Sequence, residues 1–134
     1  MIELHGWMTV LETPGDEDAI PQQELDRIRS TVQAVLSEAD CGVELQYRNG
    51  QAFLSTLYCG NHRTPQTDAI INTYRRIAEA APGSYGMLCI RDDADNAFRN
   101  AFQILVFKRG GCHRRTDTDF SPCIPVIEDE PAAQ

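Results

Sequence analysis

The sequence lacks the long apolar segments that mark a protein of the membrane or of the secretory route. Its longest uninterrupted run of aliphatic and aromatic residues spans only 104–107, whereas a membrane-spanning helix needs about 20 apolar residues. The opening residues, Met-Ile-Glu-Leu-His, carry neither the basic start nor the apolar stretch of a secretory signal. We therefore expect a cytoplasmic protein that has no membrane partner.

Positive charge is scarce, and the basic residues form no evident cluster along the sequence. The chain has 12 Lys and Arg against 20 Asp and Glu, a net charge of −8 at pH 7. Nucleic-acid binding draws much of its affinity from Lys and Arg on phosphates, so we expect no nucleic-acid partner. The carboxylates do cluster, which indicates either a solubilising surface or a negative surface that steers a basic protein partner.

Cysteine and histidine are too few and too irregularly spaced to form a recognisable metal or catalytic motif. The five cysteines are an odd number and no two are spaced C-x-x-C, which is typical of reduced cytosolic thiols. Four residues could still supply zinc ligands or a thiol nucleophile, namely Cys59, His62, His113 and Cys123. We expect no metal, no cofactor and no catalysis, and a small thiol- or zinc-dependent enzyme is the alternative.

Hydrophobic periodicity predicts five strands and two helices in a single domain over 1–134. Alternating or continuous apolar residues predict strands over 2–12, 43–47, 53–59, 86–90 and 98–108. Stripes at helical spacing predict amphipathic helices from about 21 to 39 and from 67 to 81. An Asn49-Gly50 turn makes the second and third strands an antiparallel hairpin, because both residues tolerate positive φ.

The order strand, helix, strand, strand, helix, strand, strand favours an α+β fold over a doubly wound parallel sheet. We expect a mostly antiparallel sheet of about five strands with two amphipathic helices on one face. The first six elements follow the ferredoxin-like order. A proline-broken, irregular segment is expected after the turn at 109–111, and a loose acidic tail at 128–134.

Four blocks of sequence, in this order, carry a resemblance to a known family. They are His5-Gly6-Trp7, then Ala81-Pro82-Gly83-Ser84-Tyr85-Gly86-Met87-Leu88, then Arg91-Asp92-Asp93, and then Ser121-Pro122-Cys123-Ile124-Pro125 before Glu128-Asp129. Together they resemble the family-seven immunity proteins of bacterial polymorphic toxin systems, over nearly the whole chain. The resemblance implies a small cytoplasmic protein, encoded beside a toxin that is delivered between competing bacteria.

Such a protein would bind the C-terminal effector domain of its cognate toxin and block it, with no catalysis of its own. Some immunity proteins also form homodimers. An acidic inhibitor suits a toxin with a basic groove for RNA, DNA or a nucleotide, because carboxylates can occupy the phosphate positions. A generic acidic adaptor is the remaining alternative.

The acidic composition suggests where a partner would bind. We expect contacts from two acidic loops that could lie near each other: Asp92, Asp93, Asp95, Asp117 and Asp119. We expect the residues of the family motifs to hold the fold rather than to contact the toxin: His5, Gly6, Trp7, Pro82, Gly83, Ser84, Tyr85, Gly86, Pro122 and Pro125.

Overall fold

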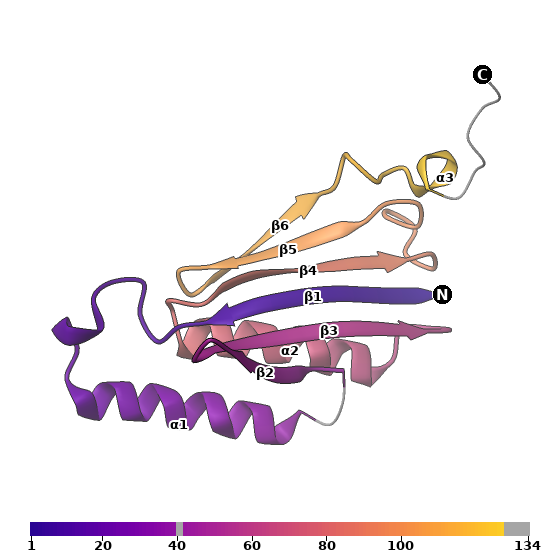
Figure 1. Ribbon diagram of the computed structural model, residues 1–134. Coiled ribbons are helices and arrows are strands. Elements are labelled where there is room, and N and C mark those ends of the chain that lie inside the picture. Colours follow the sequence, from indigo (N-terminus) through magenta and orange to yellow (C-terminus); the bar gives the residue numbers. More distant parts are fainter. Residues whose placement is uncertain (40–41, 128–134) are drawn as a thin grey trace.

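The computed structural model describes residues 1–39 and 42–127. Cys41 and the tail at 128–134, which the sequence predicts to be loose, lie outside the described residues. The rest of the chain forms two layers, a sheet and a pair of helices packed on one of its faces (Figure 1).

In the described residues, one antiparallel sheet of six strands runs in the order β2-β3-β1-β4-β5-β6 (Figure 1). The strands are β1 (Ile2–Val10), β2 (Glu44–Arg48), β3 (Gln51–Gly60), β4 (Tyr85–Asp92), β5 (Gln103–Lys108) and β6 (Gly111–Thr116). The first four strands and the two helices have the ferredoxin-like arrangement that the element order predicts. The β5–β6 hairpin extends this sheet at the β4 side.

Two long helices, α1 (Gln22–Glu38) and α2 (Pro65–Ala80), lie on the same face of the sheet (Figure 1). Their predicted apolar stripes are the buried ones, including Val32 on α1 and Ile77 on α2. They form one core with alternate residues of the strands, among them Leu4 and Leu88. The α+β prediction, with two amphipathic helices on one face, is therefore confirmed, although the strands number six rather than about five.

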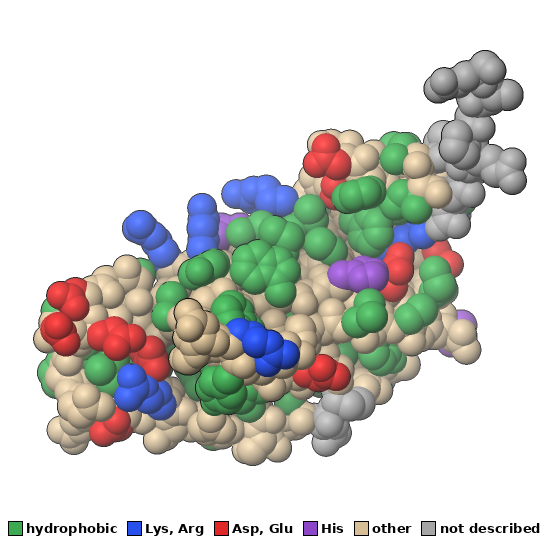
Figure 2. Space-filling model, in the orientation of Figure 1, with side chains coloured by type: hydrophobic (Ala, Val, Ile, Leu, Met, Phe, Trp, Pro, Cys, Tyr) green, Lys and Arg blue, Asp and Glu red, His purple; other side chains and the backbone are tan. Residues whose placement is uncertain are grey.

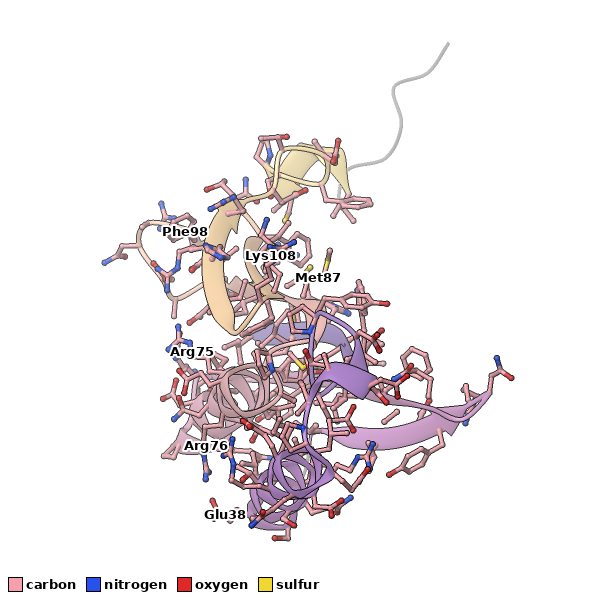
Figure 3. All side chains as sticks on the ribbon, turned by 90° about the vertical axis from the view of Figure 1, so that its left-hand side faces the viewer. Glu38, Arg75, Arg76, Met87, Phe98 and Lys108 are labelled. Atoms are coloured by element: carbon pink, nitrogen blue, oxygen red, sulfur yellow. The ribbon has the colours of Figure 1, made fainter. Side chains whose placement is uncertain are left out.

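An ion pair also joins the two helices at the surface. The guanidinium of Arg76 on α2 lies 2.6 Å from the carboxylate of Glu38 on α1 (Figure 3). Hydrogen bonding to Arg76 lowers the pKa of Glu38. Both side chains are half exposed, and solvent screens exposed pairs of this kind so that they add little to stability. The apolar core, rather than this pair, holds the helices on the sheet.

The predicted Asn49-Gly50 hairpin is confirmed, and a second hairpin of the same kind joins β5 to β6. Asn49 and Gly50 have φ values of 52° and 75°, and Arg109 and Gly110 have values of 49° and 78°. Two consecutive residues at positive φ are typical of the turns that join antiparallel strands tightly. The second turn brings residues 111–116 back along β5 as a paired strand.

Strand β6 corrects the expectation that the chain is irregular after the turn at 109–111. Its sequence, Gly-Cys-His-Arg-Arg-Thr, shows no apolar alternation because it is an edge strand whose residues are mostly exposed. Strand β5 also begins later than predicted, at Gln103. The preceding residues 98–102 form turns, in which the backbone N–H of Ala101 donates to the carbonyl of Phe98 at 3.1 Å.

A tyrosine ring fills the space beneath the central strand. Gly6 of β1 faces the helices, and a Cβ at this position would lie 2.5 Å from Leu88 Cδ1 and 3.0 Å from the hydroxyl of Tyr74. That hydroxyl is hydrogen-bonded to Thr56 Oγ1 at 2.8 Å, with both groups buried. Burial raises the pKa of Tyr74 to about 12. Glycine at position 6 therefore lets a large ring and its polar end pack directly under the sheet.

The turn after α2 is fastened to the end of β1. The side chain of Ser84 is fully buried, and its Oγ accepts from the N–H of Leu11 at 3.1 Å and donates to the Leu11 carbonyl at 3.3 Å. The neighbouring Gly83 approaches the backbone of Thr13 so closely that a Cβ there would lie 2.3 Å from its carbonyl. These contacts hold the loop that follows β1 against the start of β4.

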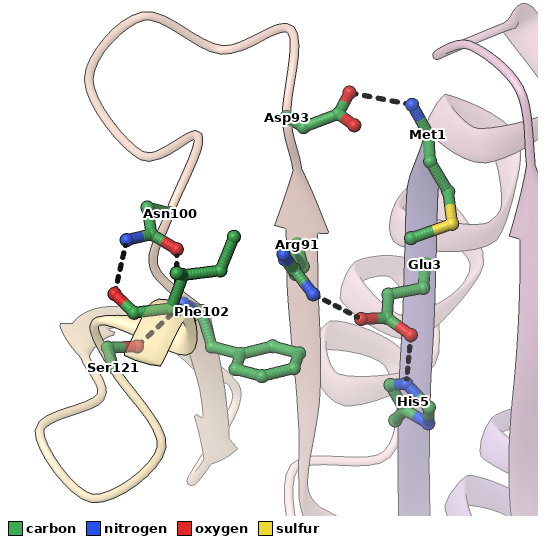
Figure 4. A network of polar contacts seen from close by, with 9 residues as sticks. Met1, Glu3, His5, Arg91, Asp93, Asn100, Phe102 and Ser121 are labelled. Atoms are coloured by element: carbon green, nitrogen blue, oxygen red, sulfur yellow. Dashed lines mark hydrogen bonds and ion pairs between the residues drawn. The ribbon is translucent and has the colours of Figure 1, made fainter. Parts of the chain in front are cut away.

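The segment expected to be irregular after β6 ends in a short helical turn, α3 (Cys123–Val126). Asn100 holds it by a reciprocal pair of hydrogen bonds, since its amide nitrogen donates to the Ile124 carbonyl at 3.1 Å and its oxygen accepts from the Ile124 N–H at 3.0 Å (Figure 4). The side chain of Cys123 is fully buried. The segment is thus anchored to the turn between β4 and β5.

Candidate protein-binding surface

In the described residues, both long helices pack on one face of the sheet and neither lies over the opposite face. Successive side chains of a strand point to opposite faces, so Trp7, which lies next to buried Met8, points away from α1 and α2. The cross-strand register continues this face over the neighbouring strands. We call this surface the open face. Along each strand its residues alternate with the buried ones. The open-face residues discussed below are His5, Trp7, Leu57, Tyr85, Met87, Val106, Lys108, His113 and Arg115.

The centre of the open face is apolar. Trp7 is 44%, Tyr85 48% and Leu57 80% exposed. Trp7 stands opposite Met87 on β4, and Met87 stands opposite Val106 on β5, so the apolar surface crosses three strands without a break. Figure 2 shows hydrophobic side chains gathered over the middle of this face. Contiguous exposed apolar surface of this kind marks interaction sites.

One edge of the open face is basic, which corrects the expectation that basic residues form no cluster. Between 96 and 116 the chain has five Lys and Arg and no Asp or Glu, and the β5–β6 hairpin gathers most of them at one edge of the sheet (Figure 2). Register places Lys108 opposite Tyr85, His113 opposite Val106 and Arg115 opposite Ile104. We call these three residues, Lys108, His113 and Arg115, the basic edge.

Of the five carboxylates predicted to contact a partner, one ends β4 and two lie in the turn that follows it. Asp92 is buried and accepts from the N–H of Ala94 at 3.1 Å. Asp95 accepts from the N–H of Ala97 at 3.0 Å. Asp93 is exposed and lies 2.6 Å from the ammonium of Met1 (Figure 4), and this hydrogen bond lowers its pKa. Each of these carboxylates thus has a partner within its own part of the fold.

The other two predicted carboxylates follow β6. Asp117 is buried, and it accepts hydrogen bonds from the N–H of Asp119 at 3.1 Å, from the N–H of Phe120 at 2.9 Å and from the hydroxyl of Ser121 at 2.8 Å. Burial by itself raises the pKa of Asp117, but the hydrogen bonds, first that of Ser121, lower it more. Asp119 is exposed. Asp117 therefore serves to shape its own loop.

The two acidic loops lie at the same end of the sheet, close to each other as expected from the sequence. The N–H of Asp117 donates to the carbonyl of Phe102 at 3.2 Å, and the next residue, Gln103, donates through its side chain to Asp95 at 3.2 Å. Only Asp93 and Asp119 are exposed among the five. A contact of any of the five with a partner stays a prediction.

Charged and aromatic residues also meet at the end of the open face (Figure 4). Glu3 accepts a hydrogen bond from His5 at 3.2 Å, and the guanidinium of Arg91 lies 3.8 Å from the same carboxylate. The ring of Phe102 meets His5 edge-on, with centroids 6.3 Å apart. Phe102 in turn donates its N–H to Ser121 Oγ at 2.9 Å. This network links β1 to the segment that carries α3.

The motif residues divide between the two faces of the sheet. Gly6, Gly83, Ser84 and Gly86 make close inward or backbone contacts, and a Cβ at Gly86 would lie 2.1 Å from the carbonyl oxygen of Trp7. His5, Trp7 and Tyr85 instead lie on the open face and are exposed. Of the motif prolines, Pro82 lies in the turn that follows α2, Pro122 directly precedes α3 and Pro125 lies within α3.

Two of the proposed zinc or thiol residues, Cys59 and His113, lie far apart in the sheet. Cys59 lies on β3 and His113 on β6, and β1, β4 and β5 lie between them. Within residues 1–39 and 42–127, no group of three or more His, Cys, Asp and Glu is placed to hold a metal ion. Burial, with a smaller effect of Asp117, raises the pKa of the Cys89 thiol, which disfavours the reactive thiolate.

A groove lies on the other side of the molecule, between α1 and the β2–β3 hairpin. It has a volume of about 480 Å³ and is lined by Val32, Leu36 and Leu45 among others. An ion pair at its edge joins Arg29 to Glu12 at 2.8 Å. The groove therefore holds a structural ion pair beside apolar residues.

Sequence reasoning did not identify the open face or its basic edge. The alternation of β1 does separate His5 and Trp7 from the buried Leu4 and Met8. It does not reveal which face of the sheet the helices cover, because that depends on the path of the chain after each strand. The basic edge depends on β6, which has no apolar alternation.

Comparison with known proteins identifies the family of this chain. No helix in the described part of the chain is long and apolar enough to cross a membrane. No curated protein and no solved structure matches the chain. A family model described as Immunity protein 7 matches residues 1–129. That match covers nearly the whole chain and agrees with the four sequence blocks, so the protein belongs to the Immunity protein 7 family.

Proposed function

We propose that this immunity protein binds the C-terminal effector domain of a cognate toxin in the cytoplasm and neutralises it by covering a surface that the toxin needs. The observation that carries the proposal is the open face. It presents an exposed apolar centre on a rigid, six-stranded sheet within the described residues. Inhibition by coverage needs a complementary surface and no reacting group on the inhibitor.

The size of the open face fits such a contact. Strands of five to ten residues, spaced about 4.8 Å apart with about 3.3 Å per residue, give a sheet face of roughly 700 Å². A stable complex of standard size covers about 800 Å² of each partner. The open face and its immediate margin are therefore sufficient for a specific complex.

The composition of the open face also resembles that of a protein interface. Aromatic residues are enriched at interface centres, and charged groups are found at the rim. Trp7 and Tyr85 lie at the centre of this face, whereas Lys108 and Arg115 lie toward its edge. Trp and Tyr are also frequent among the residues that dominate binding energy.

The test is co-expression with the toxin domain encoded beside the immunity protein. Host survival is scored first, and the two proteins are then tested for co-elution on a sizing column. Survival together with a stable complex supports the proposal. Survival without a complex, or death with both proteins well expressed, contradicts neutralisation by direct binding.

A further inference from the structure

We propose that the toxin surface that docks on the open face is apolar at its centre and acidic at the side that meets the basic edge. This inference rests on the proposed function, since it names the chemistry of the surface that the immunity protein covers. It also differs from the sequence-based expectation, in which carboxylates of the immunity protein would enter a basic groove of the toxin.

Positive and negative charges are separated within the protein. The net charge is −8, yet residues 96–116 have five Lys and Arg and no carboxylate. A partner that approaches the β5–β6 hairpin therefore meets positive potential on a protein that is acidic as a whole. Attraction to the nearest charges dominates at short range, because salt screens those beyond about 8–10 Å.

The cations of the basic edge lie beside the apolar centre of the open face. Lys108 neighbours Tyr85 across the β4–β5 pair, and Arg115 neighbours Ile104 across the β5–β6 pair. Adjacent strands lie about 4.8 Å apart, so the aliphatic parts of these side chains border the apolar centre while their charged groups stay in water. A partner seated on Trp7 and Tyr85 lies beside Lys108, and one that extends across β5 to β6 also reaches Arg115.

The basic edge has no ion pair with a carboxylate of the described residues. In the described residues, no carboxylate forms an ion pair with Lys108, His113 or Arg115. The carboxylates of Glu12, Glu38 and Asp93, in contrast, are each paired with a cation of the same chain. The positive charges, rather than these negative ones, are available to a partner.

The charges on strand β6 disfavour a second copy of the chain as the partner at this edge of the sheet. Strand β6 is an edge strand, and its His113, Arg114 and Arg115 are exposed. Charged residues on an edge strand oppose pairing with another edge of the same kind. Side-by-side pairing of two β6 strands would bring these like charges together, so an acidic partner fits this edge better than a second copy does.

The test compares two neighbouring arginines on β6 that lie on opposite faces of the sheet. Arg115 stands opposite Ile104 on the open face, whereas Arg114 stands opposite buried Leu105 and lines a hollow with Asp68 and Arg75 of α2. Arg115→Glu and Arg114→Glu make the same change in charge on the same strand. Arg114→Glu is therefore the matched control, and thermal melting checks that both variants fold.

Association of each purified variant with a catalytically inactive toxin domain is measured by stopped flow at low and high salt. We expect Arg115→Glu to slow association about tenfold at low salt, because rim charges act mainly on the association rate. Arg114→Glu should stay within about twofold of the wild type, and high salt should slow the wild type and remove the difference. Lys108→Glu should act like Arg115→Glu.

Several outcomes would overturn the inference while leaving the proposed function intact. One is tight wild-type binding with an unchanged rate for Arg115→Glu, and another is equal slowing by Arg114→Glu. A faster Arg115→Glu variant, or slower association after Asp119→Lys, would instead indicate a basic toxin surface. Wild-type dimers on a sizing column that Arg115→Glu dissociates would show that a second copy occupies the face. Failure of the wild type to bind the toxin at all would overturn the proposed function as well.

Discussion

The indole ring of Trp7 meets the phenol ring of Tyr85 edge-on at the surface of the sheet, with centroids 6.2 Å apart and an angle of 84° between the ring planes. The two residues form a diagonal pair on neighbouring strands, since Trp7 stands opposite Met87 and Tyr85 stands opposite Thr9, and both are about half exposed. Edge-to-face packing holds each ring in one orientation. The open face therefore presents a packed aromatic pair, which in the proposed complex would contact a partner with little loss of side-chain entropy.

Trp7→Ala should weaken toxin binding far more than it weakens the fold. We expect a loss of about 2 kcal/mol or more in binding, as for aromatic residues at interface centres. The free energy of unfolding should fall by about 1 kcal/mol or less, which is typical of cross-strand aromatic pairs. Calorimetric titration and urea unfolding measure the two quantities. Tyr47→Ala is the matched control, because Tyr47 is an exposed aromatic on β2 that lines the α1 groove instead; equal weakening by both variants would contradict the assignment.

Gly6→Ala should destabilise the protein by about 1–3 kcal/mol, the usual cost of overpacking a core. The new Cβ would lie 2.5 Å from Leu88 Cδ1 and 3.0 Å from the Tyr74 hydroxyl, so one of the two buried side chains must shift. Urea unfolding measures the change. At Gly15 a Cβ would meet nothing closer than 3.9 Å, and Gly15→Ala should change stability by less than about 0.5 kcal/mol. A neutral Gly6→Ala would mean that the space beneath β1 is larger than described.

Ser84→Ala should cost about 1–3 kcal/mol, because it leaves the part-buried N–H and carbonyl of Leu11 without the serine hydroxyl. The loop after β1 should open more often, which hydrogen exchange at Leu11 would detect as lost protection. Ser37→Ala is the control, since the Ser37 hydroxyl bonds to the Ala34 carbonyl at the exposed surface of α1. Similar effects of the two substitutions would argue against a special role for the buried serine.

Asp117→Asn should lower stability at pH 7 and reduce its dependence on pH in acid. The pKa of Asp117 is lowered in the folded protein, so its stabilisation is complete above the unfolded value of about 3.9. That stabilisation is lost as the pH falls from there through the lower folded value. Urea unfolding at pH 7, 4 and 3 should therefore show that the difference in free energy of unfolding between wild type and variant becomes smaller in acid. The variant Asp119→Asn, which removes the same charge from an exposed neighbour, is the matched control.

Removal of divalent metal should leave both stability and toxin binding unchanged. In the described residues no group of three or more His, Cys, Asp and Glu could hold a metal ion, and Cys59 and His113 lie on strands separated by three others. The melting temperature with and without a strong chelator measures this. A fall after chelation, restored by zinc, would revive the alternative of a zinc-dependent protein.

Most of the fold is predictable because its signals are local. The stripes containing Val32 and Ile77 specify the buried sides of both helices, and Asn49-Gly50 specifies a tight hairpin. Strand β6 is not predictable in this way, since an exposed edge strand has no buried face to impose alternation. Its hairpin also uses Arg109 at positive φ, where sequence reasoning expects glycine or asparagine.

The candidate site is harder to predict than the fold, because exposure is a property of the assembled molecule. The sequence marks Asp92 and Asp117 as acidic residues in loops, but their carboxylates turn inward to bind their own backbone. Short side chains such as Asp commonly bond to the backbone N–H groups of a turn. Trp7 is the opposite case, since a large aromatic residue in a strand suggests the core, and only the one-sided placement of the helices leaves it exposed.

The position of Trp7 has a practical consequence, because it is the only tryptophan in the sequence. Indole emission depends on contact with water, and all of this signal comes from the centre of the open face. When a partner covers that face and removes water from the ring, the emission of the unlabelled protein should shift to shorter wavelength. The immunity protein thus carries an intrinsic fluorophore for following the occupation of its own surface in real time.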